Sequence, residues 1–404
     1  MREIGVALIG TKFMGKAHAN AYRQVRAFFA PEVLPKLTMA CGTEPKTTRD
    51  FAFRFGFARY TTNWEEAVAA GDVDLVDICA PNDLHFPLAE AAAKHGKAVF
   101  CEKPLARNLE EAKAMLKAVA EAGVPHMICF NYRFFPAIQL AKKLISEGAL
   151  GEIRQFHALY LQDWGLAPGL PLTWRFQKER AGSGALGDTA VHIVDLARFL
   201  VGEIAEVTGM LTTFIPERPL PDGSGMGKVT VDDTAAFLAR FQSGATGVFE
   251  TSRIALGRKN FMHIEINGSR GSIFWNAEDP NWALALFPRR SSRHSRFPKN
   301  HGHGGGSSLR AKLVAHRPHP RLRTHLCPRR FGVLRGPGRR PESNARFSRW
   351  GQSPGRIGGG SCFRKKPALG ESAELKMGKK AQIVRPKEAD ILNSPAQHSH
   401  ALNP

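Results

Sequence analysis

The first 130 residues alternate between short apolar runs and longer stretches of helical periodicity, and this alternation limits the possible fold more than any other feature. Apolar runs predict strands at residues 4–9, 37–41, 75–79, 98–101 and 126–130. Helical patterns separate them at residues 14–29, 47–55, 85–95 and 109–122. Strands that alternate with helices form βαβ units with a buried parallel sheet. We therefore predict an α/β Rossmann domain over residues 1–130.

The pattern changes after Pro136. A helical pattern at residues 137–147 precedes longer runs in which apolar and polar residues alternate, at residues 153–162, 204–215, 234–241, 247–252 and 262–266. Strands that follow one another without helices pair mainly antiparallel. The second domain, residues 131–287, is thus predicted to be α+β with a mostly antiparallel open sheet. Residues 216–228 are rich in Pro and Gly and are expected to form a mobile loop.

Residues 288–404 differ from the rest of the chain in both charge and pattern. They contain 26 Lys and Arg against 5 Asp and Glu, and thus account for the whole net charge of +21. Their richness in Arg, Gly, Pro and Ser, without a sustained period, predicts a disordered basic tail. Codons for residues 322–336, read one base later, can encode a peptide with helical spacing. The tail is thus either a frameshift product, which would truncate the sheet and leave an unpaired edge, or a genuine extension.

The composition also limits the compartment and the partners. Six cysteines without CxxC pairs favour a reducing compartment over a disulfide framework or a zinc site. No run approaches the roughly 20 apolar residues needed to span a bilayer. The basic tail lacks the interleaved aromatic residues of single-strand binders. We therefore expect a cytoplasmic protein with no membrane and no specific nucleic-acid partner.

A glycine-containing turn, residues 10–15, directly follows the first strand and opens the first helix. In dinucleotide-binding proteins such a turn brings the backbone and the helix N-terminus close to the pyrophosphate. A plain strand-to-helix turn is the alternative, because Lys12 replaces the middle glycine of the usual pattern. The candidate cofactor-binding residues here are Gly10, Lys12, Phe13, Met14 and Gly15.

Further cofactor candidates follow the next strands, because ligands of open α/β sheets lie at the carboxyl ends of the strands. Glu44 can accept a hydrogen bond from a ribose hydroxyl, which favours NAD, or it is only a solvated loop residue. Thr43 could instead accept the 2′-phosphate of NADP. The other candidates are Ala80, Pro81, Asn82, His85, Glu102 and Lys103.

Three residues have side chains suited to the chemistry of a hydroxyl group. The ammonium of Lys103 can polarise a substrate hydroxyl, although most lysines are surface residues. Asp188 and His192 are four residues apart and share a helix face. His192 is suited to act as a general base, with a buried core histidine as the alternative. We expect no metal, because no third ligand is spaced to complete an Asp-x-x-x-His site.

In this order and at this separation, the motif Glu102-Lys103-Pro104 and the Asp188–Asp195 segment resemble those of the Gfo/Idh/MocA (glucose–fructose oxidoreductase and inositol dehydrogenase) family. The resemblance covers residues 3–287, and residues 160–164 and 174–178 are most like those of the levoglucosan and inositol dehydrogenase branch. Departures from the family pattern are Lys12, Ala80 and Ala190.

The resemblance implies catalytic roles for Lys103, Asp188 and His192, and NAD or NADP as the cofactor. The implied reaction is the oxidation of a sugar or cyclitol CH–OH group, and the family implies a homo-oligomer. The residues expected to contact the polyol are Arg133, Asp163, Trp164 and Arg175, with a core role for Trp164 equally open. Two alternatives are an NAD-binding protein with impaired catalysis and a nucleic-acid binder that uses the basic tail.

Overall fold

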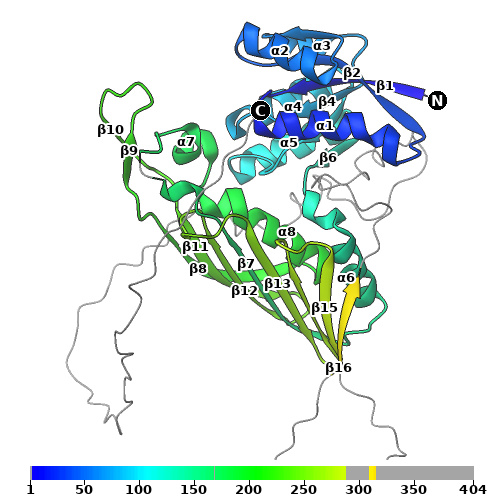
Figure 1. Ribbon diagram of the computed structural model, residues 1–404, viewed down its shortest axis with the longest axis vertical. Coiled ribbons are helices and arrows are strands. Elements are labelled where there is room, and N and C mark those ends of the chain that lie inside the picture. Colours follow the sequence, from blue (N-terminus) through cyan, green and yellow to red (C-terminus); the bar gives the residue numbers. More distant parts are fainter. Residues whose placement is uncertain (1, 168, 288–308, 315–404) are drawn as a thin grey trace, which may run out of the picture. The chain divides into compact units, whose positions relative to one another are not determined.

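The computed structural model describes residues 2–167 and 169–287, and the backbone of residues 309–314 (Figure 1). The remainder of the predicted disordered tail, with the segment that concerns the reading frame, lies outside these described residues. Within them, no helix combines the length and the apolar character that crossing a membrane requires.

A six-stranded sheet in the order β3-β2-β1-β4-β5-β6 forms the first domain, and its neighbouring strands are all parallel. The strands are β1 (Arg2–Ile9), β2 (Val33–Cys41), β3 (Arg59–Thr61), β4 (Leu75–Ile78), β5 (Ala98–Cys101) and β6 (His126–Ile128). The helices are α1 (Phe13–Phe28), α2 (Pro45–Phe55), α3 (Trp64–Ala69), η1 (Asn82–Leu84), α4 (His85–Lys94) and α5 (Leu109–Glu121). This is the strand order of a dinucleotide-binding sheet, which confirms the predicted Rossmann domain.

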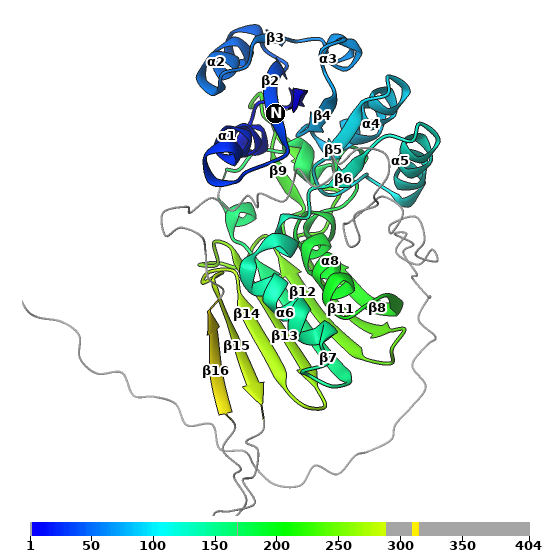
Figure 2. The same cartoon turned by 90° about the vertical axis from the view of Figure 1, so that its right-hand side faces the viewer.

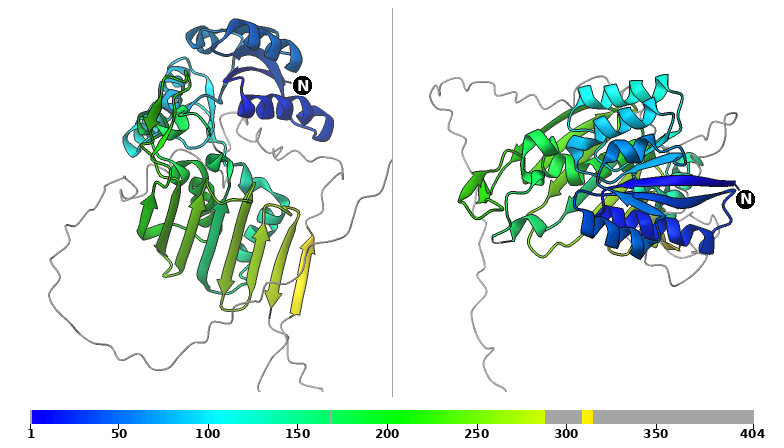
Figure 3. Two further views of the ribbon diagram at one scale, coloured as in Figure 1. Left: turned by 60° about the vertical axis from the view of Figure 1, so that its left-hand side comes forward. Right: turned by 90° about the horizontal axis from the view of Figure 1, so that it is seen from above.

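Helices lie on both faces of the parallel sheet, as the view from above shows (Figure 3). Consecutive side chains of a strand therefore enter different cores: Leu8 packs in the core that contains Phe100, and Ile9 in the core that contains Val99. The sequence analysis missed β3 and α3, because segments of three and six residues are shorter than the periods that revealed the other elements.

An eight-stranded sheet in the order β16-β15-β14-β13-β7-β12-β11-β8 forms the second domain (Figure 3). Only β7 and β12 pair parallel among the described neighbours, which confirms a mostly antiparallel open sheet. The strands are β7 (Ile153–Leu161), β8 (Ile204–Thr212), β11 (Thr234–Phe241), β12 (Thr246–Ser252), β13 (Phe261–Gly268), β14 (Ser272–Asn276), β15 (Trp282–Phe287) and β16 (Leu309–Val314). Shorter elements are η2 (Asn131–Phe134), η3 (Trp164–Leu166), η4 (Trp174–Phe176) and α7 (Lys178–Ala181).

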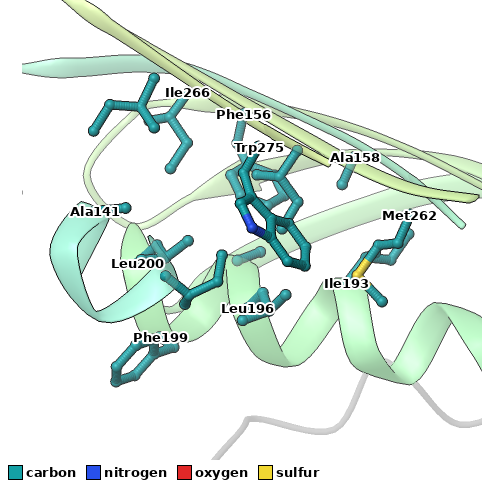
Figure 4. Close-up of a cluster of buried hydrophobic side chains, with 14 of the residues drawn as sticks. Ala141, Phe156, Ala158, Ile193, Leu196, Phe199, Leu200, Met262, Ile266 and Trp275 are labelled. Atoms are coloured by element: carbon teal, nitrogen blue, oxygen red, sulfur yellow. The ribbon is translucent and has the colours of Figure 1, made fainter. Parts of the chain in front are cut away.

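Two helices, α6 (Pro136–Ser146) and α8 (Val191–Leu200), lie on one face of this sheet (Figure 2). Leu196 and Ile193 of α8 pack near Trp275 of β14 in the resulting core (Figure 4). The opposite face is not covered by any described helix. The strands therefore alternate in burial, as β12 does, whereas β4 and β5 of the first sheet are buried throughout.

Two expectations for the second domain need correction. Residues 216–228 do not form an irregular loop, because β9 (Glu217–Pro219) and β10 (Met226–Lys228) pair as an antiparallel hairpin. Arg218 is buried in this hairpin, with its guanidinium 4.0 Å from the centre of the Phe176 ring. The prediction of an unpaired sheet edge is also wrong at β15, because β16 pairs with this strand antiparallel. The basic tail therefore supplies one strand, although its composition gave no sign of it.

Candidate active site

The turn between β1 and α1 is closely packed against the strand beside it. Gly10 has a φ of +110°, and a Cβ there would lie 2.4 Å from the carbonyl oxygen of Cys79. A Cβ on Gly15 would lie 1.8 Å from the carbonyl oxygen of Gly10. Both positions therefore require glycine. Lys12 has a φ of −80°, so the lysine that replaces the middle glycine is accommodated without backbone strain.

The N-terminus of α1 is open to an anion. Lys12 precedes the helix without a side-chain capping hydrogen bond, and the first turn contains no acidic residue. The first N–H groups of a helix have no partner within the helix, and its dipole is positive at this end. Lys12 and Phe13 are exposed, and Met14 is half-buried. This turn therefore fits the pyrophosphate of a dinucleotide.

Of the two candidates after β2, Glu44 has a structural role that was not predicted. Thr43 and Glu44 are exposed, but the carboxylate of Glu44 caps helix α2. Its two oxygens accept hydrogen bonds from the backbone N–H groups of Lys46 at 2.9 Å and Thr47 at 2.6 Å. The hydrogen bonds from Thr47 and then Lys46 lower the pKa of Glu44. Each oxygen keeps a second lone pair for a ribose hydroxyl, so capping and cofactor contact are compatible.

The side chains after β4 mainly hold loops in place. Asn82 donates a hydrogen bond to the carbonyl oxygen of Ala181 at 2.9 Å. The two ring nitrogens of buried His85 lie 3.0 Å from the carbonyl oxygen of Ala80 and 2.8 Å from that of Pro104. Burial lowers the pKa of His85. The structure thus gives Asn82 and His85 protein partners, and they connect the segments around Ala80 and Lys103.

Lys103 and Asp188, 85 positions apart in the sequence, form a salt bridge. The Nζ of Lys103 donates to the Oδ1 of Asp188 at 2.9 Å and to its carbonyl oxygen at 2.7 Å. Asp188 lies in a π-helical turn, η5 (Leu186–Ala190), directly before α8. Burial alone would raise the pKa of Asp188, but the charges of Lys103 and Arg253 hold it well below its usual range. Asp188 is therefore a carboxylate.

His192, in the first turn of α8, is 6 % exposed. Its Nδ1 is buried and has no hydrogen-bond partner among the described residues. The ring of Tyr132 lies edge-on to the imidazole at 4.8 Å between centroids. Burial and, to a lesser degree, the positive charge of Lys103 lower the pKa of His192 to about 3. The imidazole is therefore neutral at physiological pH and able to accept a proton.

Of the predicted polyol-binding residues, Arg133 has a different partner. Its Nε and Nη2 donate to the two carboxylate oxygens of Asp195 at 2.7 and 2.5 Å, and both side chains are buried. The guanidinium also lies 5.0 Å from the centre of the Phe199 ring. Asp195, which lies on the same helix as His192, therefore binds the Arg133 guanidinium through both of its carboxylate oxygens.

The other three predicted polyol contacts lie at the surface or beside it. Asp163 accepts hydrogen bonds from the Nζ of Lys259 at 2.8 Å and the backbone N–H of Gly257 at 3.1 Å. The half-buried ring of Trp164 lies 5.7 Å from that of Phe176, so one part of it belongs to a small core. Arg175 is exposed and contributes to lowering the pKa of Asp188.

The sequence analysis missed Arg253, which lies directly after β12. It is 1 % exposed, and its Nη1 lies 4.0 Å from the Oδ2 of Asp188. Its Nη2 donates to the carbonyl oxygen of Asp232 at 3.1 Å. The carboxylate of Asp232 in turn accepts from the N–H groups of Gly184 and Leu186 at 2.8 Å. The available signal in the sequence was a charged residue directly after the predicted strand 247–252.

Two further residues that were not predicted, His18 and Asp77, lie beside the predicted residue Glu102. His18 of α1 contacts Asp77 of β4 and Glu102, which follows β5. Cys79 and Cys129 lie close enough to complete two sets of metal-ligand type with these residues. The three side chains already satisfy one another at hydrogen-bonding distances of 2.7–2.9 Å. An acidic residue inside an apolar strand, as Asp77 is, was the signal that a buried partner exists.

Comparisons with known proteins agree with this architecture. The family model described as "Oxidoreductase family, NAD-binding Rossmann fold" matches residues 4–130. The model described as "GFO/IDH/MocA C-terminal domain" matches residues 138–274.

Individual relatives give the same result. A levoglucosan dehydrogenase of Pseudarthrobacter phenanthrenivorans is 47 % identical over 291 residues, which are 69 % of this chain and 75 % of the relative. An inositol 2-dehydrogenase of Rhizobium meliloti is 29 % identical over 66 % of this chain and 73 % of its own. A solved levoglucosan dehydrogenase in complex with NADH and levoglucosan has a TM-score of 0.72 at 42 % identity, covering 80 % of this chain and 85 % of that one. The chain therefore belongs to the GFO/IDH/MocA family of oxidoreductases, and its first domain is the family's NAD-binding Rossmann domain.

Proposed function

We propose that this oxidoreductase converts a ring CH–OH group of a sugar or cyclitol to a ketone, with His192 as the general base and Lys103 as the group that polarises the hydroxyl. NAD, when bound at the turn after β1, accepts the hydride from the carbon. The observation that carries the proposal is the Lys103–Asp188 salt bridge together with a neutral, buried His192 whose Nδ1 has no hydrogen-bond partner in the described part of the chain.

Each of the three residues has a separate task. The neutral imidazole of His192 takes the hydroxyl proton as the C–H bond breaks, so that charge and atoms balance. The ammonium of Lys103 stabilises the negative charge that develops on the same oxygen. The carboxylate of Asp188 holds Lys103 in place by its hydrogen bond at 2.9 Å, and its second oxygen is directed toward Arg253 or a neighbouring substrate hydroxyl.

For the substrate, we propose a small polyol or anhydrosugar of the levoglucosan type. The levoglucosan dehydrogenase relative supports this choice by its 47 % identity, against 29 % for the inositol 2-dehydrogenase. Arg175, Asp163 and the exposed part of Trp164 are the proposed polyol contacts. Arg133 is not among these contacts, because it is buried and paired with Asp195 of α8.

We also propose that two copies of the chain associate through the uncovered face of the eight-stranded sheet. Cross-strand partners share a face, and the pairing places exposed apolar side chains on this one, namely Met210, Leu238, Val248 and Phe274. Exposed apolar area of this kind marks association surfaces. A cytoplasmic location is supported by the buried cysteines Cys41 and Cys101, which form no disulfide with another described residue.

The test is the reduction of NAD by the full chain with levoglucosan, myo-inositol and D-apiose in parallel. We expect turnover with at least one of them, and levoglucosan to give the highest kcat/KM. His192→Gln and Lys103→Met should each lower kcat by roughly 10²-fold, the usual contribution of a positioned acid–base group. His95→Gln and Lys113→Met, at exposed positions of the same domain as Lys103, are the matched controls and should leave kcat unchanged. Wild-type turnover in either site variant would refute the assigned roles.

A further inference from the structure

Three ionisable side chains that the proposed reaction does not use lie buried behind Lys103. His18 and Asp77 are 0 % exposed and Glu102 is 5 % exposed. The Nδ1 of His18 lies 2.8 Å from a carboxylate oxygen of Asp77, and its Nε2 lies 2.7 Å from the Oε1 of Glu102. Charges this deeply buried persist only when they are paired and hydrogen-bonded.

Each ring nitrogen of His18 faces a carboxyl group in this cluster. An ionised carboxylate can only accept hydrogen bonds. Burial alone would raise the pKa of Glu102, but the hydrogen bond and the charge of His18 lower it to about 2. Glu102 is therefore ionised, and its Oε1 accepts a hydrogen bond from the Nε2 of His18 at 2.7 Å.

Glu102 connects this cluster to the main chain of Lys103. The Oε2 of Glu102 accepts a hydrogen bond from the backbone N–H of Lys103 at 3.2 Å, while its Oε1 is held by His18. Asp77 fixes the other side of the imidazole from β4, the strand next to β5. The position of the Lys103 backbone thus depends on a carboxylate whose own position depends on His18.

We propose that His18 is a positioning residue for Lys103 and acts through Glu102. The proposal rests on the catalytic role proposed above for Lys103. A small misplacement of a reacting group lowers the rate strongly, because alignment supplies a large part of catalysis. Loss of the His18 imidazole removes the hydrogen-bond partner that Glu102 and Asp77 share in the interior, so that Glu102 and the segment that carries Lys103 shift.

This proposal differs in a measurable way from a purely structural role. A residue that only stabilises the fold lowers the rate by the same factor whether or not Lys103 has its amine. A residue that acts by placing the Lys103 amine has no effect once the amine is gone. The two cases are separated by a double-mutant cycle on the rate of hydride transfer.

The experiment measures single-turnover NADH formation with the polyol that the wild-type chain oxidises, in four proteins: wild type, His18→Gln, Lys103→Met and the double variant. We expect His18→Gln to lower the rate roughly tenfold in the wild-type chain and less than twofold in the Lys103→Met background. Equal factors in the two backgrounds would overturn the positioning role and leave the proposed function intact. His263→Gln, at a half-buried histidine of β13, is the control. It should change the single-turnover rate by the same factor with Lys103 and with Lys103→Met.

If His18→Gln does not fold, Glu102→Gln provides the same cycle, because it keeps the shape of the side chain and removes only its charge. The expected result is again a roughly tenfold loss that disappears with Lys103→Met, and equal losses would again reject the proposal. A wild-type rate in the single variant Lys103→Met would instead refute the proposed function. It would also refute the positioning role of His18, which depends on that function.

Discussion

The two sheets of this protein bury their residues in different ways, and the difference explains how the candidate site is divided between them. The parallel sheet has helices on both faces, so neighbouring residues of one strand, such as Leu8 and Ile9, enter two separate cores. The eight-stranded sheet is covered on one face only, so Trp275 is 1 % exposed while its neighbour Phe274 is 36 % exposed.

As a consequence of this difference, the two sheets position their site residues in different ways. The parallel sheet presents residues at the carboxyl ends of its strands, where the turn after β1 and the Lys103 segment after β5 both lie. The open sheet presents residues through a helix packed on its covered face, and α8 with η5 carries His192 and Asp188. The uncovered face remains available for a second copy.

The most demanding test of this comparison is a pair of substitutions in each sheet. Trp275→Ala should destabilise the protein by about 3–5 kcal/mol, whereas Phe274→Ala should cost on the order of 1 kcal/mol or less. In β1, Leu8→Ala and Ile9→Ala should both cost about 2–5 kcal/mol, because both faces are buried. The measurement is the urea midpoint followed by circular dichroism. Equal losses for Trp275 and Phe274 would contradict the one-sided burial.

The second test concerns the ionisable groups that α8 brings into the interior. The pKa of His192 is about 3 in the folded chain, below its usual value near 6.5. At pH values between these two pKa values, His192 binds a proton in the unfolded chain but not in the folded chain. The free energy of unfolding therefore falls as the pH falls. The slope is at most about 1.4 kcal/mol per pH unit from this residue.

We therefore expect a chemical-denaturation series from pH 7 to pH 4 to show a loss of stability on acidification, and His192→Gln to flatten it. His95→Gln, an exposed histidine of the parallel-sheet domain, should leave the slope unchanged. A slope that is insensitive to His192→Gln would show that the imidazole is not neutral in the interior.

The third test sharpens the role of the parallel sheet in cofactor choice. Glu44→Ala removes both the cap of α2 and the proposed ribose acceptor, and should raise the KM for NAD roughly tenfold relative to that for NADP. Glu44→Asn keeps a capping oxygen but removes the negative charge. If only the alanine variant loses affinity for NAD, Glu44 acts through the helix cap, and if neither changes the NAD to NADP preference, its contact with the ribose is disproved.

The smallest effect on stability is expected on the uncovered face of the open sheet. Leu238→Glu should change the free energy of unfolding by roughly 0.5 kcal/mol or less, because Leu238 is 55 % exposed. It should nevertheless shift sedimentation velocity profiles toward the monomer, since it places a charge in the proposed interface. Unchanged association would show that this face is not where copies meet.

Much of the molecule follows from local sequence patterns. The apolar runs and the glycine turn predicted the Rossmann domain, and the order of the motifs predicted which strand ends carry Gly10, Glu102 and Lys103. Alternation predicted the open sheet. These features are readable because periodicity and glycine requirements act within a few residues of the chain. Strand β16 could not be predicted from the sequence pattern, because its pairing with β15 is made by backbone hydrogen bonds, which do not require a particular pattern of residues.

The pairing of buried polar groups could be read only from the folded structure. The residue types and spacing of Lys103, Asp188 and His192 already indicated the right chemistry. They did not indicate that Lys103 meets Asp188, that Arg133 pairs with Asp195, or that His18 lies between Asp77 and Glu102. The two kinds of information differ in their range along the chain. Periodicity is a local property of the chain, whereas the pairing of a buried charge is enforced by the free-energy cost of leaving it unpaired in the interior, and partners that meet this requirement come from anywhere in the sequence.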